Sequence, residues 1–115
     1  MRKDDAIRIR HMFEALNEAL AFAEGKSRDD FMRDRMLVLS VVKCIEIIGE
    51  AASKITSETR TRHLDIPWVE IIAMRNRLIH VYYDIDIDRV WDTIVDDLPT
   101  LKKSLSQLTQ FDGLK

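Results

Sequence analysis

Residues 27–55, "SRDDFMRDRMLVLSVVKCIEIIGEAASKI", decide the fold, because their apolar side chains recur at the three- and four-residue steps of a helix. Ser27, followed by Asp30 three residues later, has the spacing of a capping box, which marks the start of a helix. The apolar side chains that would line one face of this helix are Phe31, Val38, Val41, Ile45, Ile48, Ala52 and Ile55. We therefore predict one long helix that starts at this capping box.

The other face of the predicted helix carries charged side chains and one glycine. Lys43, Glu46, Glu50 and Lys54 follow one another at the spacing of ion pairs on a helix surface. We interpret them as such pairs and assign no chemistry to the two glutamates. Gly49 costs about 1 kcal/mol against alanine inside a helix, so its presence predicts the close approach of another backbone or side chain.

A shorter amphipathic stretch precedes this helix, and another follows it. Residues 4–24 form the first predicted helix, which ends where Gly25 could adopt a left-handed cap. After a polar connection at residues 56–65, Pro67 suits the first turn of a third helix. The apolar side chains that we assign to the third helix are Ile71, Ile72, Leu78 and Ile79.

A fourth helix follows the segment "IHVYYDID", which is β-branched and aromatic and therefore poor in helix formers. Asp86 or Asp88 could cap this helix, whose apolar stripe runs over residues 90–108, and we expect Pro99 to bend it. The chain holds only three glycines and two prolines, which favours long regular elements. We therefore predict the all-α class, as an antiparallel bundle of four to five helices.

The composition limits the possible classes of function. With 115 residues the chain fits one compact domain, and we expect residues 1–115 to form a single unit. Its formal net charge of −2 argues against nucleic-acid binding through bulk positive charge, so any phosphate recognition must be local. Neither a run of about eighteen apolar residues nor a secretory signal occurs. We expect a cytoplasmic protein that has no membrane partner.

The residue types that most often hold metals or stack on bases give no strong signal. Cys44 is the chain's single cysteine, so it offers neither a disulfide nor metal-ligand spacing, and we interpret it as a buried, inert thiol. His11 and His63 are isolated and have no metal-spaced companion. Trp68 and Trp91 lie on apolar stripes and are interpreted as core residues. We therefore expect no metal and no cofactor.

Residues 75–82, "RNRLIHVY", carry the strongest chemical signal of the chain. In an unbroken helix Arg75 and His80 would lie about 140° apart and about 7.5 Å apart along the axis, so their side chains would not converge. If the helix frays near Ile79, His80 can swing back toward the last turn and share a cleft with Arg75 and Asn76.

Arg75, Asn76 and His80 together suit phosphate chemistry. A planar guanidinium binds phosphate, a histidine that titrates near neutrality moves protons, and an amide can orient either group. These groups suffice for RNA cleavage without a metal, in which the ribose 2′-hydroxyl attacks its own phosphodiester while arginine stabilises the developing charge. Cations in the last turn of a helix also stabilise its dipole, so the residues alone leave a structural role open.

Four blocks of the sequence resemble the HepT family of the HEPN superfamily. They are "EIIGEAA" at 46–52, "DIPWVEIIAMRNRLIH" at 65–80, "RNRLIHVYYDID" at 75–86 and "DRVWDTIVDDLPTLK" at 88–102. The blocks occur in the family's order and span nearly the whole chain, which makes the resemblance far more specific than the short motif. The fold implied is the all-α, HEPN-like bundle, present as a homodimer.

The resemblance also implies roles for single residues. The family's Arg-x4-His-x-Tyr motif lies in a cleft at the dimer interface and corresponds here to Arg75, His80 and Tyr82, with Asn76 as an orienting or substrate-binding residue. The implied protein is a toxin that acts as a metal-independent ribonuclease on RNA. Its partner would be a minimal nucleotidyltransferase antitoxin, which silences it by attaching AMP to Tyr82. Val81 departs from the glycine of many relatives, and its β-branch restricts the turn.

A second hypothesis, from a different class, is a non-catalytic helical module. Such a module would bind nucleotide, or would serve as substrate and partner of the nucleotidyltransferase. The two hypotheses differ in whether His80 must move a proton. A neighbouring reading frame for a small nucleotidyltransferase would establish the pairing, whereas neither the RNA target nor the cleavage context is encoded in a recognisable pattern.

Overall fold

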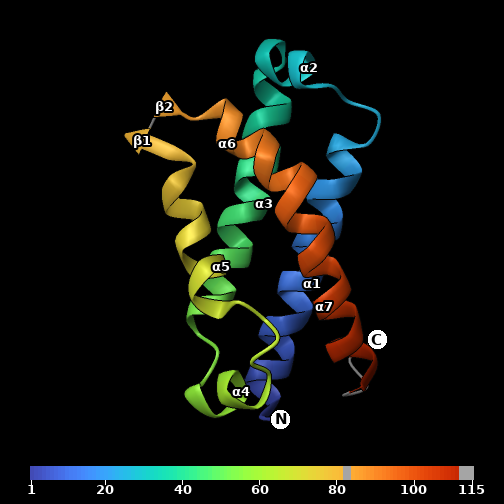
Figure 1. Cartoon of the computed structure of the whole chain (residues 1–115), viewed down its shortest axis with the longest axis vertical. Helices are drawn as coiled ribbons and strands as arrows, with labels where there is room; N and C mark the ends of the chain where they lie inside the picture. The colour runs from blue at the N-terminus through green and yellow to red at the C-terminus, as the bar shows by residue number, and fades with distance from the viewer. Residues whose placement is uncertain (82–83, 112–115) are drawn as a thin grey trace.

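A computed structural model describes residues 1–81 and 84–111 of the chain, and these residues form an elongated helical bundle of 42 × 28 × 19 Å (Figure 1). Its main rods alternate in direction along the long axis. The elements in chain order are α1 (Lys3–Ala23), α2 (Arg28–Arg33), α3 (Arg35–Ser53), α4 (Ser57–Arg62), α5 (Trp68–Met74), a 3₁₀ turn (Arg75–Arg77), β1 (Ile79–Val81), β2 (Asp84–Ile85), α6 (Ile87–Asp92), a π-helical segment (Thr93–Asp97) and α7 (Leu98–Phe111). The predicted all-α class and antiparallel bundle are confirmed.

The core forms between α1, α3, α5 and the rod that α6 and α7 build together. Every apolar residue of the stripe predicted between Phe31 and Ile55 is buried. Burying one such side chain contributes about 1.5–3 kcal/mol, so this stripe supplies a large share of the driving force for folding. Trp68 is buried, and Trp91 packs edge-on against Phe31 with ring centroids 5.3 Å apart, which confirms both tryptophans as core residues.

The single long helix predicted from Ser27 onward is wrong in one respect, because the chain breaks it at Asp34. The capping box of Ser27 and Asp30 is present, but it starts only the short α2. Asp34 then leaves helical geometry (φ −112°, ψ 93°), and its carboxylate accepts a hydrogen bond from the backbone N–H of Leu37. A short polar side chain that bonds nearby backbone offers the chain an alternative to a continuous helix.

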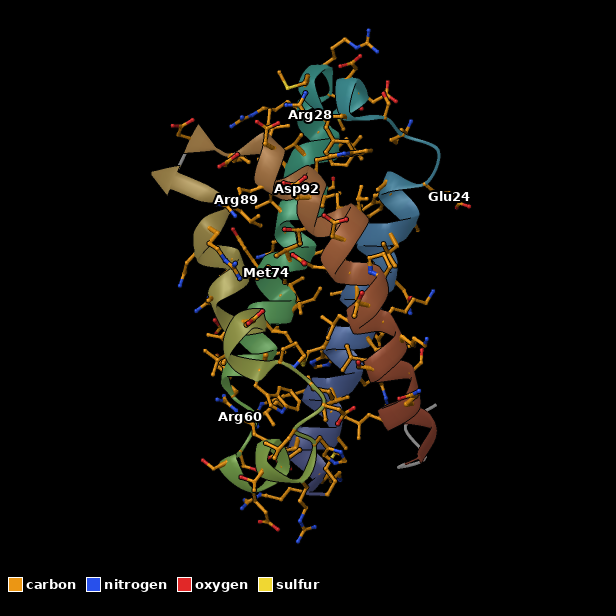
Figure 2. All side chains as sticks on the ribbon, viewed as in Figure 1. Glu24, Arg28, Arg60, Met74, Arg89 and Asp92 are labelled. Atoms are coloured by element: carbon orange, nitrogen blue, oxygen red, sulfur yellow. The ribbon has the colours of Figure 1, made fainter. Side chains whose placement is uncertain are left out.

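The connection at residues 56–65 contains α4, which was not predicted. Thr56 caps α4 by accepting from the backbone N–H of Thr59, and both threonine hydroxyls donate to the buried carboxylate of Asp5 on α1. Arg60 donates to the carbonyl oxygens of Ala52 and Ser53, near the end of α3 (Figure 2). Tertiary bonds therefore stabilise a helix that has almost no apolar periodicity.

The third helix is shorter than predicted, and this shapes the candidate site. The helix ends at Met74. The chain then forms the 3₁₀ turn and continues into β1, which pairs antiparallel with β2. Leu78 is buried as expected, but Ile79 is a strand residue that pairs with Ile85. Strands accommodate the β-branched residues of this segment better than a helix does.

Two of the remaining predictions for helix ends are confirmed, whereas Pro67, which was predicted in the first turn of the third helix, is its N-cap, one residue before α5 begins. Gly25 has a left-handed φ of 74° just after α1, and Asp86 caps α6 by accepting from the backbone N–H of Arg89 at 3.1 Å. The π-helical segment ends at Asp97, two residues before Pro99, which was predicted to bend this part of the chain and whose ring removes a helical N–H donor. Cys44 is a free, buried thiol, and burial, assisted by the charge of Glu18, raises its pKa.

Among the described residues, none of the helices has the length and apolar character needed to cross a membrane.

Candidate active site

An open groove of about 810 Å³ lies between α1, α3 and the 3₁₀ turn that follows α5. Arg75 and Asn76, two of the residues singled out in the sequence, line it together. The groove is also lined by three further basic residues and by three acidic ones, which are Arg8, Lys43, Lys54, Asp4, Glu46 and Glu50. Together with Arg75, the basic residues exceed the acidic ones by one charge. A groove with this lining is suited to bind an anion such as a phosphate.

Arg75 is held in the groove by a carboxylate from α3. Its Nη1 donates to Oε2 of Glu50 at 2.8 Å, and Oε1 of the same carboxylate lies 3.3 Å from Nζ of Lys54. The hydrogen bond from Arg75, and then that from Lys54, lowers the pKa of Glu50. The ion-pair interpretation of Glu50 and Lys54 is confirmed, but the sequence did not indicate that Glu50 also binds Arg75.

Gly49 makes this placement of Arg75 possible. A Cβ on Gly49 would lie 3.1 Å from Cδ and 3.5 Å from Cγ of Arg75, and 3.6 Å from the carbonyl oxygen of Ile71. The predicted close approach to this glycine is therefore confirmed. The groups that approach are the backbone of α5 and the aliphatic stem of the candidate catalytic arginine.

The end of α5 positions the motif residues. The helix stops one residue before Arg75, so Arg75 and Asn76 lie in a tighter 3₁₀ turn. His80 lies in β1, where the register with β2 slips between Ile79 and Val81. Because Arg75 and His80 do not lie in one continuous helix, the angle and axial distance that an unbroken helix would give them do not apply. Tyr82 lies outside the described residues.

Residues of α1 also line the groove, although the sequence analysis did not connect them with it. His11 was described as isolated, yet it lines the same groove as Arg75 and Asn76. Arg8 lines it as well, three residues earlier on the same helix. The signal that would have revealed this face is the i, i+3, i+4, i+7 spacing of Asp4, Ile7, Arg8 and His11. These residues place α1 beside the candidate catalytic centre.

Comparison with known proteins gives consistent results. Residues 12–108 match the family described as "HepT-like: Ribonuclease HepT-like". "Putative RNase TTE0752" of Caldanaerobacter subterraneus subsp. tengcongensis is 33% identical over 102 residues, which cover 89% of this chain and 91% of that protein. "Probable ribonuclease HepT" of Thermococcus cleftensis is 35% identical over 99 residues, which cover 83% of this chain and 90% of that protein. "Putative RNase MJ1380" of Methanocaldococcus jannaschii is 32% identical over 94 residues, which cover 82% and 86%. No solved structure matches the chain.

Proposed function

Because the chain belongs to the HepT-like ribonuclease family, we propose that it is an endoribonuclease that cleaves RNA without a metal ion, with Arg75 and His80 as its catalytic residues. The observation that carries this proposal is the position of Arg75. Its side chain keeps 32% of its surface exposed and lines an open groove beside Asn76. A guanidinium in such a place can bind the phosphate of a substrate that enters from solvent.

The proposed reaction starts from the ribose 2′-hydroxyl next to the scissile bond. Its oxygen attacks the phosphorus, the bond from phosphorus to the 5′-oxygen breaks, and a cyclic 2′,3′-phosphate and a 5′-hydroxyl result. His80 moves the protons, because an imidazole with a pKa near neutrality can accept one from the 2′-hydroxyl or donate one to the leaving oxygen. Arg75 stabilises the charge that develops on the phosphate oxygens, and Asn76 orients the substrate.

The resemblance to HepT toxins extends the proposal to regulation. The protein would be the toxin of a toxin–antitoxin pair, and its partner would be a minimal nucleotidyltransferase that attaches AMP to Tyr82. Tyr82 follows His80 by two residues, as the family motif requires. The added nucleotide would bring a phosphate charge and considerable bulk close to the catalytic residues, so it would block the substrate without any change of fold.

The proposed active protein is a homodimer. Ile47 of α3 and Ile7 of α1 are exposed apolar residues that line the groove. Met36 and Leu39 are also exposed, and their helical spacing of eleven and eight residues from Ile47 puts them on the same side of α3. Exposed apolar patches of this kind mark surfaces that bind other proteins. A second copy that covers this face would bring two grooves together.

The decisive experiment measures RNA cleavage by purified protein in the presence of EDTA. We expect wild type to cleave, and we expect Arg75→Ala and His80→Ala each to lose about 10²- to 10⁴-fold in rate, as is typical when a general acid–base or charge-stabilising group is removed. Arg62→Ala is the matched control, because Arg62 is an exposed arginine that pairs with Glu58 away from the groove. Undiminished cleavage by His80→Ala would favour the non-catalytic module instead.

A second arm of the same experiment tests the proposed silencing. Wild type and Tyr82→Phe are incubated with ATP and the cognate nucleotidyltransferase, and the modified residues are then mapped by peptide mass spectrometry. We expect AMP on Tyr82, no modification of Tyr82→Phe, and no cleavage by the modified wild type. Modification that persists in Tyr82→Phe would contradict the assigned residue but would leave the nuclease proposal intact.

A further inference from the structure

We propose that Glu50 is a positioning residue of the nuclease site, which holds the guanidinium of Arg75 in the one orientation that a substrate phosphate can use. The inference rests on the proposed function and adds to it a residue that acts through Arg75. The feature that carries it is a cradle for the arginine on α3, formed by Gly49 and Glu50, which are neighbours in the sequence.

The cradle contacts Arg75 at two points along its side chain. The bare backbone of Gly49 lies under the stem, close enough that even one added carbon would sit 3.1 Å from Cδ of Arg75. The carboxylate of Glu50 binds the head of the side chain through Nη1 at 2.8 Å. Arginine is long and has many rotamers, so contacts at both the stem and the head are needed to select one of them.

The bond to Glu50 leaves Arg75 able to bind a substrate. A guanidinium carries five N–H donors in a rigid fork, and Glu50 takes a donor from one nitrogen only. The remaining donors can pair with two oxygens of a phosphate. Glu50 thus orients the fork without filling it.

Because Lys54 also pairs with Glu50, the carboxylate does not fully neutralise the positive charge of Arg75. The carboxylate of Glu50 is shared between Arg75 and Lys54, and all three residues line the groove. Two cations share this one anion, and over the whole groove the basic residues Arg8, Lys43, Lys54 and Arg75 exceed the acidic residues Asp4, Glu46 and Glu50 by one charge, which remains for a phosphate. The carboxylate still repels the incoming phosphate, so its positioning role has a cost in substrate affinity.

A fall in kcat that is accompanied by a fall in KM therefore identifies the role of Glu50. In Glu50→Ala the arginine loses its fixed orientation and the groove loses a negative charge, so we expect kcat to fall about 10- to 100-fold, as misplaced groups cause, while KM also falls. Glu50→Gln keeps an acceptor for Arg75 and should retain most of kcat with a lower KM. Gly49→Ala, which displaces the stem and changes no charge, should lower kcat without lowering KM.

Glu58→Ala is the matched control for Glu50→Ala. Glu58 is an exposed glutamate that also pairs with a basic residue four positions along its helix, but it does not line the groove. We expect its kcat and KM to equal those of wild type. Circular dichroism verifies the fold of each variant, and Glu50→Gln and Gly49→Ala provide the test even if Glu50→Ala does not fold.

The outcomes separate this inference from the proposed function. A kcat of Glu50→Ala equal to that of wild type, together with an inactive Arg75→Ala, would overturn the role of Glu50 and leave the nuclease intact. Absence of cleavage by wild type would overturn the proposed function itself. NMR titration of the Glu50 carboxyl detects the pair without any catalysis, because its lowered pKa should rise in Arg75→Ala, and an unchanged pKa would overturn the cradle.

Discussion

Asp5 shows at the scale of one residue how a charge can stabilise this fold. Its side chain is fully buried near the start of α1, where it accepts hydrogen bonds from the backbone N–H of Thr56 at 3.1 Å and from the hydroxyls of Thr56 and Thr59 at 2.5 and 2.6 Å. Burial raises the pKa of this carboxyl, but the hydrogen bonds from the two threonines outweigh burial, so the pKa lies below its usual value. The ionised form is therefore the one that suits the folded protein.

We predict that Asp5 makes the protein less stable in acid. Because its pKa is lower in the folded chain than in the unfolded chain, its contribution is fully present above the unfolded value of about 4 and is lost as the pH falls through the folded value. Replacing Asp5 by alanine at pH 7 should cost about 1–3 kcal/mol, because the backbone N–H of Thr56 and the hydroxyls of Thr56 and Thr59 all lose their acceptor. Urea unfolding at pH 7 and pH 3 measures both effects.

Asp4→Ala is the control for this prediction, because Asp4 occupies the same first turn but is exposed. Its free energy of unfolding should stay close to that of wild type. An Asp5→Ala protein as stable as wild type would show that Thr56 and Thr59 find other acceptors.

At the scale of the element, two separate caps divide what the apolar pattern presents as one helix. Ser27 starts α2 and Asp34 starts α3, each through a hydrogen bond to a backbone N–H three residues later. The break redirects the chain at the top of the bundle, where Arg28 of α2 pairs with Asp88 of α6 (Figure 2). The break that Asp34 caps therefore allows α2 to contact α6.

We predict that Asp34→Ala lowers the free energy of unfolding by about 0.5–2 kcal/mol, the usual cost of removing an N-terminal cap. Thermal or urea unfolding measures this change, and Asp29→Ala, which alters an exposed acid inside α2, is the control. If Asp34→Ala were instead more stable than wild type, the break would be imposed by packing and the cap would merely tolerate it.

At the scale of the whole molecule, the proposed dimer makes its own prediction. Met36 and Leu39 are 80% and 46% exposed, and their helical spacing puts them on the same side of α3 as Ile47, which lines the groove, so a partner that covers this side would bury them. We expect wild type to sediment as a dimer at micromolar concentration, and we expect Leu39→Asp to shift it toward monomer, because an unpaired charge in an apolar interface is costly. Val69→Asp, at an exposed apolar residue of α5, should remain dimeric. A wild-type monomer would contradict the proposal.

The sequence by itself determined the features that depend on near neighbours along the chain. The buried stripe on α3, the cap at Ser27 and the left-handed Gly25 all follow from spacings of a few residues, which a local pattern records completely. The pattern left the cap of α6 open between Asp86 and Asp88, and the structure shows Asp86. Arg75 and Asn76 were likewise identified from a short motif, and the structure places both in one groove.

Only the tertiary structure decided the contacts between distant segments. Glu50 binds Arg75 across 25 residues of chain, Asp5 holds α4 from more than 50 residues away, and His11 joins the groove from another helix. Apolar periodicity shows which face of a helix is buried but not which helix covers it, so it cannot specify such partners. The early end of α5 has a more local origin, because the segment at residues 79–86 is poor in helix formers and β1 pairs with β2 a few residues later, a pairing that the helical pattern did not predict.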